Sequence, residues 1–180
     1  LVISYSAGGP VDIVGRIAGQ KLSEALGQPV IADNRAGANG NIATEIVARS
    51  TPDGHTLLVG SNGSIAINPS LYKRLAVDPL RDLAPVTLLA ASPLILVTHP
   101  SVAPNSAKEL IQMAKSRPGE VNFASAGSGS SAHLAAELFK VMANVDLAHI
   151  PFKGAAPALN DLVAGQVQLM FTGVSATLPF

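Results

Sequence analysis

Residues 121–140, VNFASAGSGSSAHLAAELFK, contain a strand, a glycine-rich loop and the start of a helix. The first five residues are mostly apolar and lie between turn residues, which is typical of a short buried strand. Ser125-Ala126-Gly127-Ser128-Gly129 is expected to form a loop, and a helix is expected to open near Ser130-Ser131. This order of elements is the basic unit of an α/β protein.

The N-terminal residues repeat the same arrangement. LVISY (1–5) is strand-like, Ser6-Ala7-Gly8-Gly9 is a second Ser-Ala-Gly loop, and a helix is expected to open near Asp12. Further strands are predicted at PVIAD (29–33), TLLVG (56–60), DLAHI (146–150) and VQLMF (167–171). Alternation of strands with helices implies mostly parallel sheets flanked by helices. The predicted fold class is therefore α/β.

Capping residues predict several helix boundaries. Asp12 is expected to be the N-cap of the first helix, and Gly27 is expected to be its C-cap. Ser106 and Glu109 have the spacing of a capping box. After the second loop, an apolar stripe marks the helix: Leu134, Leu138 and Val141, with Phe139 and Met142 beside it.

Composition excludes several classes of function. Twelve Lys and Arg balance twelve Asp and Glu, and aromatic residues are few, so no nucleic-acid partner is expected. Cysteine is absent, which excludes disulfides and thiolate catalysis. The apolar runs are too short to cross a bilayer, so no membrane insertion is expected. His55, His99 and His149 are scattered, and we predict no metal site.

A boundary between two lobes is expected near Ala91-Ser92-Pro93. There, APVTLLAAS is followed at once by PLILVTHP, so that two extended apolar runs are joined by a proline, and a new strand-helix series begins. We predict a first lobe over residues 1–91 and a second over 92–180. The alternative is one continuous sheet with a proline at its surface.

Both Ser-Ala-Gly loops are predicted to bind an anion. The free N–H groups and the dipole at a helix start attract negative charge, and glycine lets a ligand approach the backbone closely. Ligands of open α/β sheets bind beyond the carboxyl ends of the strands, where both loops are expected. The loops contain no Arg or Lys. Neutral donors on two facing loops favour a receptor that captures and releases a carboxylate over an enzyme.

A family resemblance rests on six stretches of the sequence. They are SAGGPVD (6–12), GQPVIADNRAGANGNIATEIVARSTPDGHTLLVGSNG (27–63), INPSLY (67–72), DLAPVTLLA (82–90), NFASAGSGSSAHLAAELFK (122–140) and HIPFKGAAPALNDLVAGQVQLMF (149–171). The chain closely resembles, over essentially its whole length, the substrate-binding receptors of tripartite tricarboxylate transporters, the Bug-type receptors. The resemblance implies a type II periplasmic-binding-protein fold with two hinged lobes. It also implies periplasmic capture of a small carboxylic acid for delivery to a membrane permease, with no enzyme activity and no cofactor.

The resemblance also implies where the ligand binds. The candidate ligand-binding residues are Tyr5, Ala7, Gly8, Gly9, Asp12, Ser61, Asn62, Ala126, Gly127, Ser128, Ser131, His133, Lys153 and Thr172. Members of the family are longer, and their chain returns to the first lobe after the second. The sequence reaches Pro179-Phe180 where that return would begin, and it starts at Leu1 without a leader, so we expect a fragment whose export signal has been removed.

Two enzyme interpretations compete with the receptor. Gly127–Ala132 (GSGSSA) fits a dinucleotide-binding fingerprint, so a dinucleotide-binding oxidoreductase is the alternative function. The acidic residue expected at the end of the next strand is missing there, because Asp146 precedes that strand. Ser131 and His133 could be a nucleophile and its base, but residues two apart on a helix do not face each other.

Structural roles compete with ligand binding at single residues. His133 could be a donor at the helix start or a packed side chain, and Lys153 could be solvated. Asp33-Asn34-Arg35 is expected to cap a strand end. Thr172 stands where the resembling receptors often carry Asp, which could pair with a ligand ammonium. We therefore predict a ligand without an amine, unless Thr172 only packs at the strand end.

Overall fold

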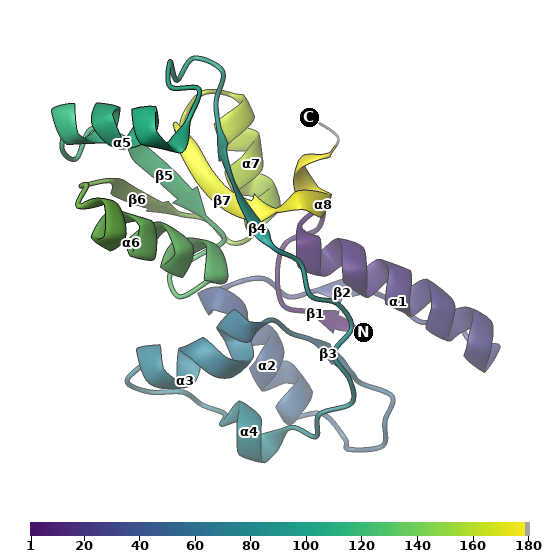
Figure 1. The fold of residues 1–180 in the computed structure, drawn as a ribbon. Helices are drawn as coiled ribbons and strands as arrows, with labels where there is room; N and C mark the ends of the chain where they lie inside the picture. Colours follow the sequence, from purple (N-terminus) through teal and green to yellow (C-terminus); the bar gives the residue numbers. More distant parts are fainter. Residues whose placement is uncertain (179–180) are drawn as a thin grey trace.

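The computed structural model describes residues 1–178, which form two separate β-sheets (Figure 1). The first sheet has the order β2-β1-β3 and the second has the order β4-β7-β5-β6. Their strands are β1 (Val2–Ile3), β2 (Asp33–Asn34), β3 (Leu58–Val59), β4 (Leu94–Thr98), β5 (Asn122–Ser125), β6 (Ala148–Pro151) and β7 (Leu169–Gly173). Every described pairing is parallel except that of β4 with β7, so the predicted α/β class is confirmed.

Helices flank both sheets. The longer ones are α1 (Pro10–Leu26), α2 (Asn41–Ala48), α5 (Ala107–Ser116), α6 (Ser131–Ala143) and α7 (Ala155–Val163). The short ones are η1 (Ala38–Gly40), η2 (Gly63–Ile67), α3 (Asn68–Leu71), α4 (Pro79–Asp82) and α8 (Val174–Thr177). Among the described residues, no helix combines the length and the apolar character that crossing a membrane requires.

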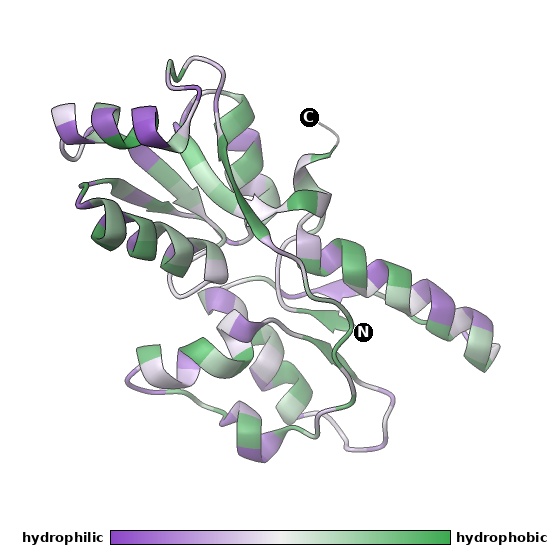
Figure 2. Ribbon diagram, viewed as in Figure 1, coloured by the Kyte–Doolittle hydropathy of each residue, from purple (hydrophilic) through white to green (hydrophobic). Residues whose placement is uncertain are grey.

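The second sheet has a hydrophobic core on each face, because side chains alternate along its strands. Phe123 and Leu169 belong to the cluster that includes residues of α5 and α6. Their neighbours Ala124 and Met170 belong to the cluster that includes residues of α7. Figure 2 shows the corresponding apolar strands between the helices. Because both faces are buried, the register of β5 and β7 is fixed. A shift by one residue would move the side chains of each cluster to the opposite face of the sheet.

Helix α1 lies close to the first sheet because two glycines face it. A β-carbon on Gly15 would lie 3.0 Å from Ile3 Cδ1, and one on Gly19 would lie 3.1 Å from Leu1 Cδ1. The close contact buries Ile3 completely. It also fixes the start of α1 relative to the carboxyl end of β1, where the first loop leaves the sheet.

The prediction that Asp12 caps α1 was wrong. The N-cap is Gly9, and Pro10 takes the first helical position, where its missing N–H costs nothing. Asp12 lies in the first turn and accepts a hydrogen bond of 2.8 Å from Gly8 N. The C-cap at Gly27 is confirmed, because that residue adopts the left-handed conformation with φ of 64°.

Two further boundaries were predicted correctly. Ser106 Oγ caps α5 by accepting from Glu109 N at 3.2 Å. Ser130 Oγ caps α6 by accepting from His133 N at the same distance. These caps stabilise helix starts that would otherwise leave N–H groups unpaired.

Two stretches differ from their predicted environment. The strand expected over residues 29–33 is shorter than predicted and pairs with β1 at Asp33–Asn34, although Ile31 O also accepts a hydrogen bond of 2.7 Å from Leu1 N. The apolar stripe of α6 lies outside the core, with Leu138 exposed to 59% and Val141 to 77%. The small residues Ala132 and Ala136 form the buried face of α6 instead.

Residues 84–93 connect the two sheets as an extended segment without helix or strand. Figure 1 shows this segment running from the part that holds α4 to β4. The division into lobes at residue 91 stays a prediction. The expected return of the chain at Pro179-Phe180 lies outside the described residues.

Candidate functional site

A pocket of about 210 Å³ lies where the carboxyl ends of the parallel strands meet. Its lining residues are Tyr5, Gly37, Ala38, Asn39, Tyr72, Ala126, Gly127, Ser128, Phe152 and Lys153. Tyr5 follows β1 of the first sheet, and Ala126, Gly127 and Ser128 follow β5 of the second. Both sheets therefore contribute residues to the lining of the pocket. Five of the fourteen predicted site residues line this pocket, and Lys153 is the one charged residue among its lining residues.

Tyr5 and Asn39 form one polar wall of the pocket. The Tyr5 hydroxyl donates to Asn39 Oδ1 at 2.7 Å and lies 3.0 Å from Ser61 Oγ. Burial raises the pKa of Tyr5 above its ordinary value, so the hydroxyl keeps its proton and remains a donor. The predicted residue Ser61 therefore acts on this wall through Tyr5, although it does not line the pocket.

A buried amide network holds Asn39 in place. Asn39 Nδ2 donates to Asn68 Oδ1 at 2.7 Å, and Asn68 Nδ2 donates to Asn39 O at 3.0 Å and to Asn41 Oδ1 at 2.6 Å. Asn39 has a φ of +51°, in the left-handed region that Asn tolerates better than most residues. Because the network satisfies these buried amides, the wall is rigid.

The second Ser-Ala-Gly loop contacts the first sheet's helices. Gly127 and Gly129 have φ of +125° and +85°, conformations that favour glycine. A β-carbon on Gly129 would overlap the Leu71 side chain and lie 3.1 Å from Asn39 Nδ2. Glycine is thus required at position 129 both by the backbone and by the closeness of the two halves.

The first Ser-Ala-Gly loop lies against the start of α7. A β-carbon on Gly8 would lie 3.4 Å from Ala156, and one on Gly9 would lie 3.7 Å from Ala155. Gly154 lies directly against the Ser6 side chain. Ala7, Gly8 and Gly9 do not line the pocket. The second Ser-Ala-Gly loop therefore contributes to the pocket lining, and these residues of the first loop do not.

Asp12 supports the first loop from beneath. Its carboxylate accepts from Gly8 N at 2.8 Å, from Arg16 Nε at 2.9 Å and from Asn34 Nδ2 at 2.8 Å. Burial pushes the pKa of Asp12 upward, but these hydrogen bonds and the Arg16 charge outweigh it, so the pKa lies below its ordinary value. Asp33-Asn34-Arg35 was predicted to cap a strand end. This is confirmed, since Asn34 Nδ2 donates to Tyr5 O just after β1 and Asp33 forms an ion pair with Arg35.

Asn62 and Ser131 are brought together although 69 residues separate them. Ser131 Oγ donates to Asn62 Oδ1 at 2.6 Å, and the same oxygen accepts from Gly63 N at 3.1 Å. Thr172 lies at the end of β7 with 2% of its surface exposed, and its hydroxyl has no hydrogen-bond partner. Ser6 Oγ is the second buried hydroxyl without a partner among the described residues.

His133 is packed behind the second loop. Its ring stacks on His149 with centroids 4.2 Å apart, and its Nδ1 accepts from Gly129 N at 3.2 Å. His149 Nε2 lies 2.7 Å from Ser125 Oγ. This distance resembles that of a nucleophile and its base, but Ser125 is 0% exposed and cannot reach a substrate. Among the described residues, no cluster of His, Asp and Glu could hold a metal.

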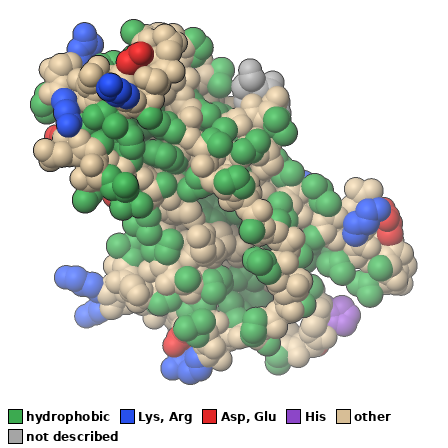
Figure 3. Space-filling view, in the orientation of Figure 1, with side chains coloured by type: hydrophobic (Ala, Val, Ile, Leu, Met, Phe, Trp, Pro, Cys, Tyr) green, Lys and Arg blue, Asp and Glu red, His purple; other side chains and the backbone are tan. Residues whose placement is uncertain are grey.

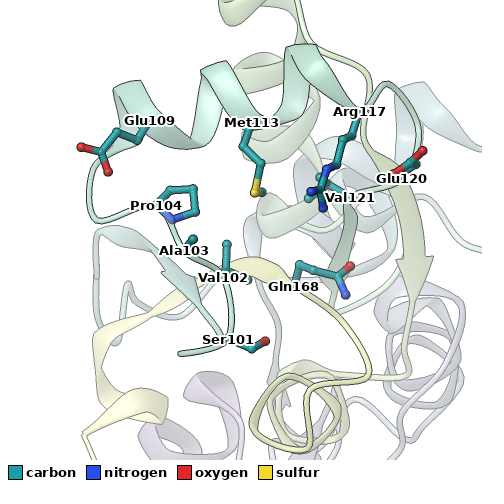
Figure 4. A pocket seen from close by; sticks show the side chains of 10 residues that line it. All are labelled: Ser101, Val102, Ala103, Pro104, Glu109, Met113, Arg117, Glu120, Val121 and Gln168. Carbon is teal, nitrogen blue, oxygen red and sulfur yellow. The ribbon is translucent and has the colours of Figure 1, made fainter.

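A larger hollow of about 660 Å³ lies at the other end of the second sheet (Figure 4). Val121 and Gln168, just before β5 and β7, line the hollow, as do Met113 on α5 and Arg117 directly after it. This position is at the amino ends of the strands, away from the loops that bind ligands in parallel sheets. Charged side chains lie mainly at the edges of the face shown in Figure 3.

Sequence reasoning did not single out Gly37, Ala38, Asn39, Tyr72 and Phe152 as site residues. A usable signal was present in Asn39-Gly40, since Asn-Gly marks a turn with positive φ. Tyr72 and Phe152 had no comparable local signal. Their place in the pocket depends on contacts between segments distant in the sequence.

The fold and this pocket define a two-sheet α/β binding protein. The family profile for the tripartite tricarboxylate transporter family receptor matches residues 14–180, and the chain belongs to this family. It is 40% identical over 179 residues to the protein BugT of Bordetella pertussis, covering 99% of this chain and 55% of that protein. The chain thus spans about half the length of the curated relatives that it matches.

Solved structures show the same architecture. The structure of Rpa4515 from R. palustris with adipate matches with a TM-score of 0.96 and 37% identity, covering 99% of this chain and 60% of that one. MatC from Rhodopseudomonas palustris with bound malate matches with a TM-score of 0.92 and 35% identity, covering 99% and 61%. The fold is therefore that of periplasmic binding proteins, and two of the similar structures contain adipate and malate.

Proposed function

We propose that the protein is a periplasmic receptor that captures a small organic carboxylate and delivers it to the membrane permease of a tripartite transporter. The observation that carries this proposal is the pocket at the carboxyl ends of β1 and β5, lined by glycine-rich backbone and Lys153. Membership of the receptor family and the adipate and malate bound to two neighbours support a carboxylate as the ligand.

The ligand is held mainly by neutral donors. Ala126 and Ser128 bring their backbone N–H groups to the pocket and Lys153 brings one positive charge, whereas the Tyr5 hydroxyl already donates its one hydrogen to Asn39 Oδ1. A hydrogen bond to a charged group contributes about 1.5–3 kcal/mol, so four or five of them, less the cost of association, give a Kd on the order of nanomolar to micromolar. Such binding is tight enough to collect an acid and weak enough to release it.

The two halves open and close on the ligand about the extended segment 84–93. Contacts between Gly129 and Leu71 and between Ser131 and Asn62 form when the halves come together. The remaining candidate residues do not line the pocket, and we propose that they act on the ligand site directly or through residues that line it: Ala7, Gly8, Gly9, Asp12, Ser61, Asn62, Ser131, His133 and Thr172.

Calorimetric titration with adipate and with malate tests this function. We expect one-to-one binding of at least one acid, which is recovered unchanged afterwards. NAD and NADP serve as the comparison, because Gly127–Ala132 fits a dinucleotide fingerprint. Binding of a dinucleotide, with no binding of either acid, would overturn the receptor in favour of an oxidoreductase domain.

A further inference from the structure

Two imidazole side chains lie directly behind the second Ser-Ala-Gly loop. His133 comes from the first turn of α6, and His149 comes from β6. Their rings are stacked with centroids 4.2 Å apart, and Phe123 stacks on His149 at 4.8 Å. Neither histidine lines the pocket, so neither is explained by contact with the ligand.

Each imidazole is bonded to a different part of the loop. His133 Nδ1 accepts from Gly129 N at 3.2 Å. His149 Nε2 lies 2.7 Å from Ser125 Oγ, and that hydroxyl accepts from Gly127 N at 3.1 Å. The two backbone N–H groups fixed in this way belong to the two loop residues with positive φ. The histidine pair therefore fixes the part of the loop that has most conformational freedom.

We propose that His133 and His149 are positioning residues that hold the loop of residues 125–130 in the conformation that binds the carboxylate. This inference rests on the proposed function of the loop. A glycine-rich loop loses much conformational entropy when it binds a ligand, and fixing it beforehand removes that cost. The rigid stack on Phe123 provides the support, since a planar ring between a helix and a strand has little freedom to move.

The hydrogen bond from Gly129 requires a neutral His133 imidazole. His133 Nδ1 accepts the Gly129 N–H and so carries no proton itself, which places the proton of the neutral ring on Nε2. Burial lowers the pKa of His133, and burial together with the His133 ring lowers the pKa of His149 to about 4. The charges that act on both rings are Glu137 and Lys140, which oppose each other, while β5 presents uncharged Phe123 and Ser125. Both rings remain neutral near pH 7.

Matched substitutions separate the hydrogen bonds from the bulk of the rings. His133→Asn and His149→Gln keep a polar group near Nδ1 and Nε2 respectively, whereas His133→Leu and His149→Leu remove it. His55→Leu is the control, because that side chain is 89% exposed and its ion-pair partner is Asp53, which is not in the loop. Amide hydrogen exchange at Gly127 and Gly129 is measured without ligand, and adipate affinity is measured by calorimetry.

We expect the two Leu variants to exchange faster at these glycines and to bind adipate roughly fivefold more weakly, the loss expected for one hydrogen bond. The Asn, Gln and His55 variants should resemble the parent. Unchanged exchange in the Leu variants would overturn the proposal, and so would fast exchange in the Asn and Gln variants. If the parent binds no acid, the receptor proposal fails, but the exchange rates still decide whether the histidines hold the loop.

Discussion

Ser131 donates a hydrogen bond of 2.6 Å to Asn62, and this bond joins the start of α6 to the loop that follows β3. The two residues lie in different halves of the fold, since α6 packs on the second sheet and β3 belongs to the first, and Asn62 is also held locally because it accepts from Gly63 N. The bond exists only while the two halves are in contact. It is therefore expected to stabilise the closed, ligand-bound arrangement more than either half alone.

Ser131→Ala should weaken adipate binding about fivefold, which corresponds to roughly 1 kcal/mol for one hydrogen bond, without changing the unfolding temperature. Asn62→Ala should cost a similar amount, and the double variant should cost no more than the larger single loss. Ser50→Ala is the control, because its hydroxyl bonds only to Ile46 O at an exposed helix end. Calorimetric titration compares the four variants with the parent. Additive losses would show that Ser131 and Asn62 act separately.

Gly129→Ala should prevent the halves from closing. The added β-carbon overlaps Leu71, and φ of +85° is unfavourable for Ala. Gly54→Ala is a matched control with φ of +82° and nothing within 4 Å, so it isolates the backbone cost of about 1 kcal/mol. We expect Gly129→Ala to lose most of its adipate affinity and Gly54→Ala to keep it. Equal affinities in the two variants would show that overlap with the Leu71 side chain does not prevent closure.

Asp12→Asn should destabilise the fold by about 2 kcal/mol near pH 7, since three charge-assisted hydrogen bonds lose their anion. The folded pKa of Asp12 lies below its ordinary value of 3.8, so its contribution is present above pH 3.8 and is lost as the pH falls through the lower folded pKa. Urea unfolding at pH 7 and pH 3 measures this. The parent should lose more stability between these pH values than the variant does. Glu24→Gln, which breaks an exposed ion pair, should change little.

The ligand should lack an amine. The described pocket-lining residues include Lys153 but no carboxylate that could pair with a ligand ammonium, and Thr172 offers only a hydroxyl. Succinate should therefore bind more tightly than aspartate in parallel titrations, and glutarate more tightly than glutamate. Tighter binding of the amino acids would refute this prediction and leave the receptor function intact.

The local units of the fold could be predicted because each carries its own signal. The strand, loop and helix of residues 121–140 and the caps at Gly27, Ser106 and Ser130 follow from nearby residues alone. Asp12 was misplaced because its type suits an N-cap, although Pro10 indicated a start at Gly9. The stripe on α6 misled because apolar spacing shows that a helix is amphipathic but not which neighbour covers it.

The site was harder to predict because distant segments build it. Asn39 is held in the pocket lining by hydrogen bonds to Tyr5 and Asn68, which lie 34 and 29 residues away in the sequence. The contact of His133 with His149 depends on the pairing of β5 with β6, where Phe123 lies opposite His149. Such relationships follow from strand register and helix docking, which no local pattern determines.

The central claim is that a carboxylate binds between the carboxyl ends of β1 and β5. A crystal structure of the protein with adipate tests it most directly. We predict one adipate in the pocket of about 210 Å³, with a carboxylate oxygen within hydrogen-bonding distance of the backbone N–H of Ala126 or Ser128. Adipate bound only in the larger hollow beside Met113 and Arg117, or nowhere in the protein, would contradict the account.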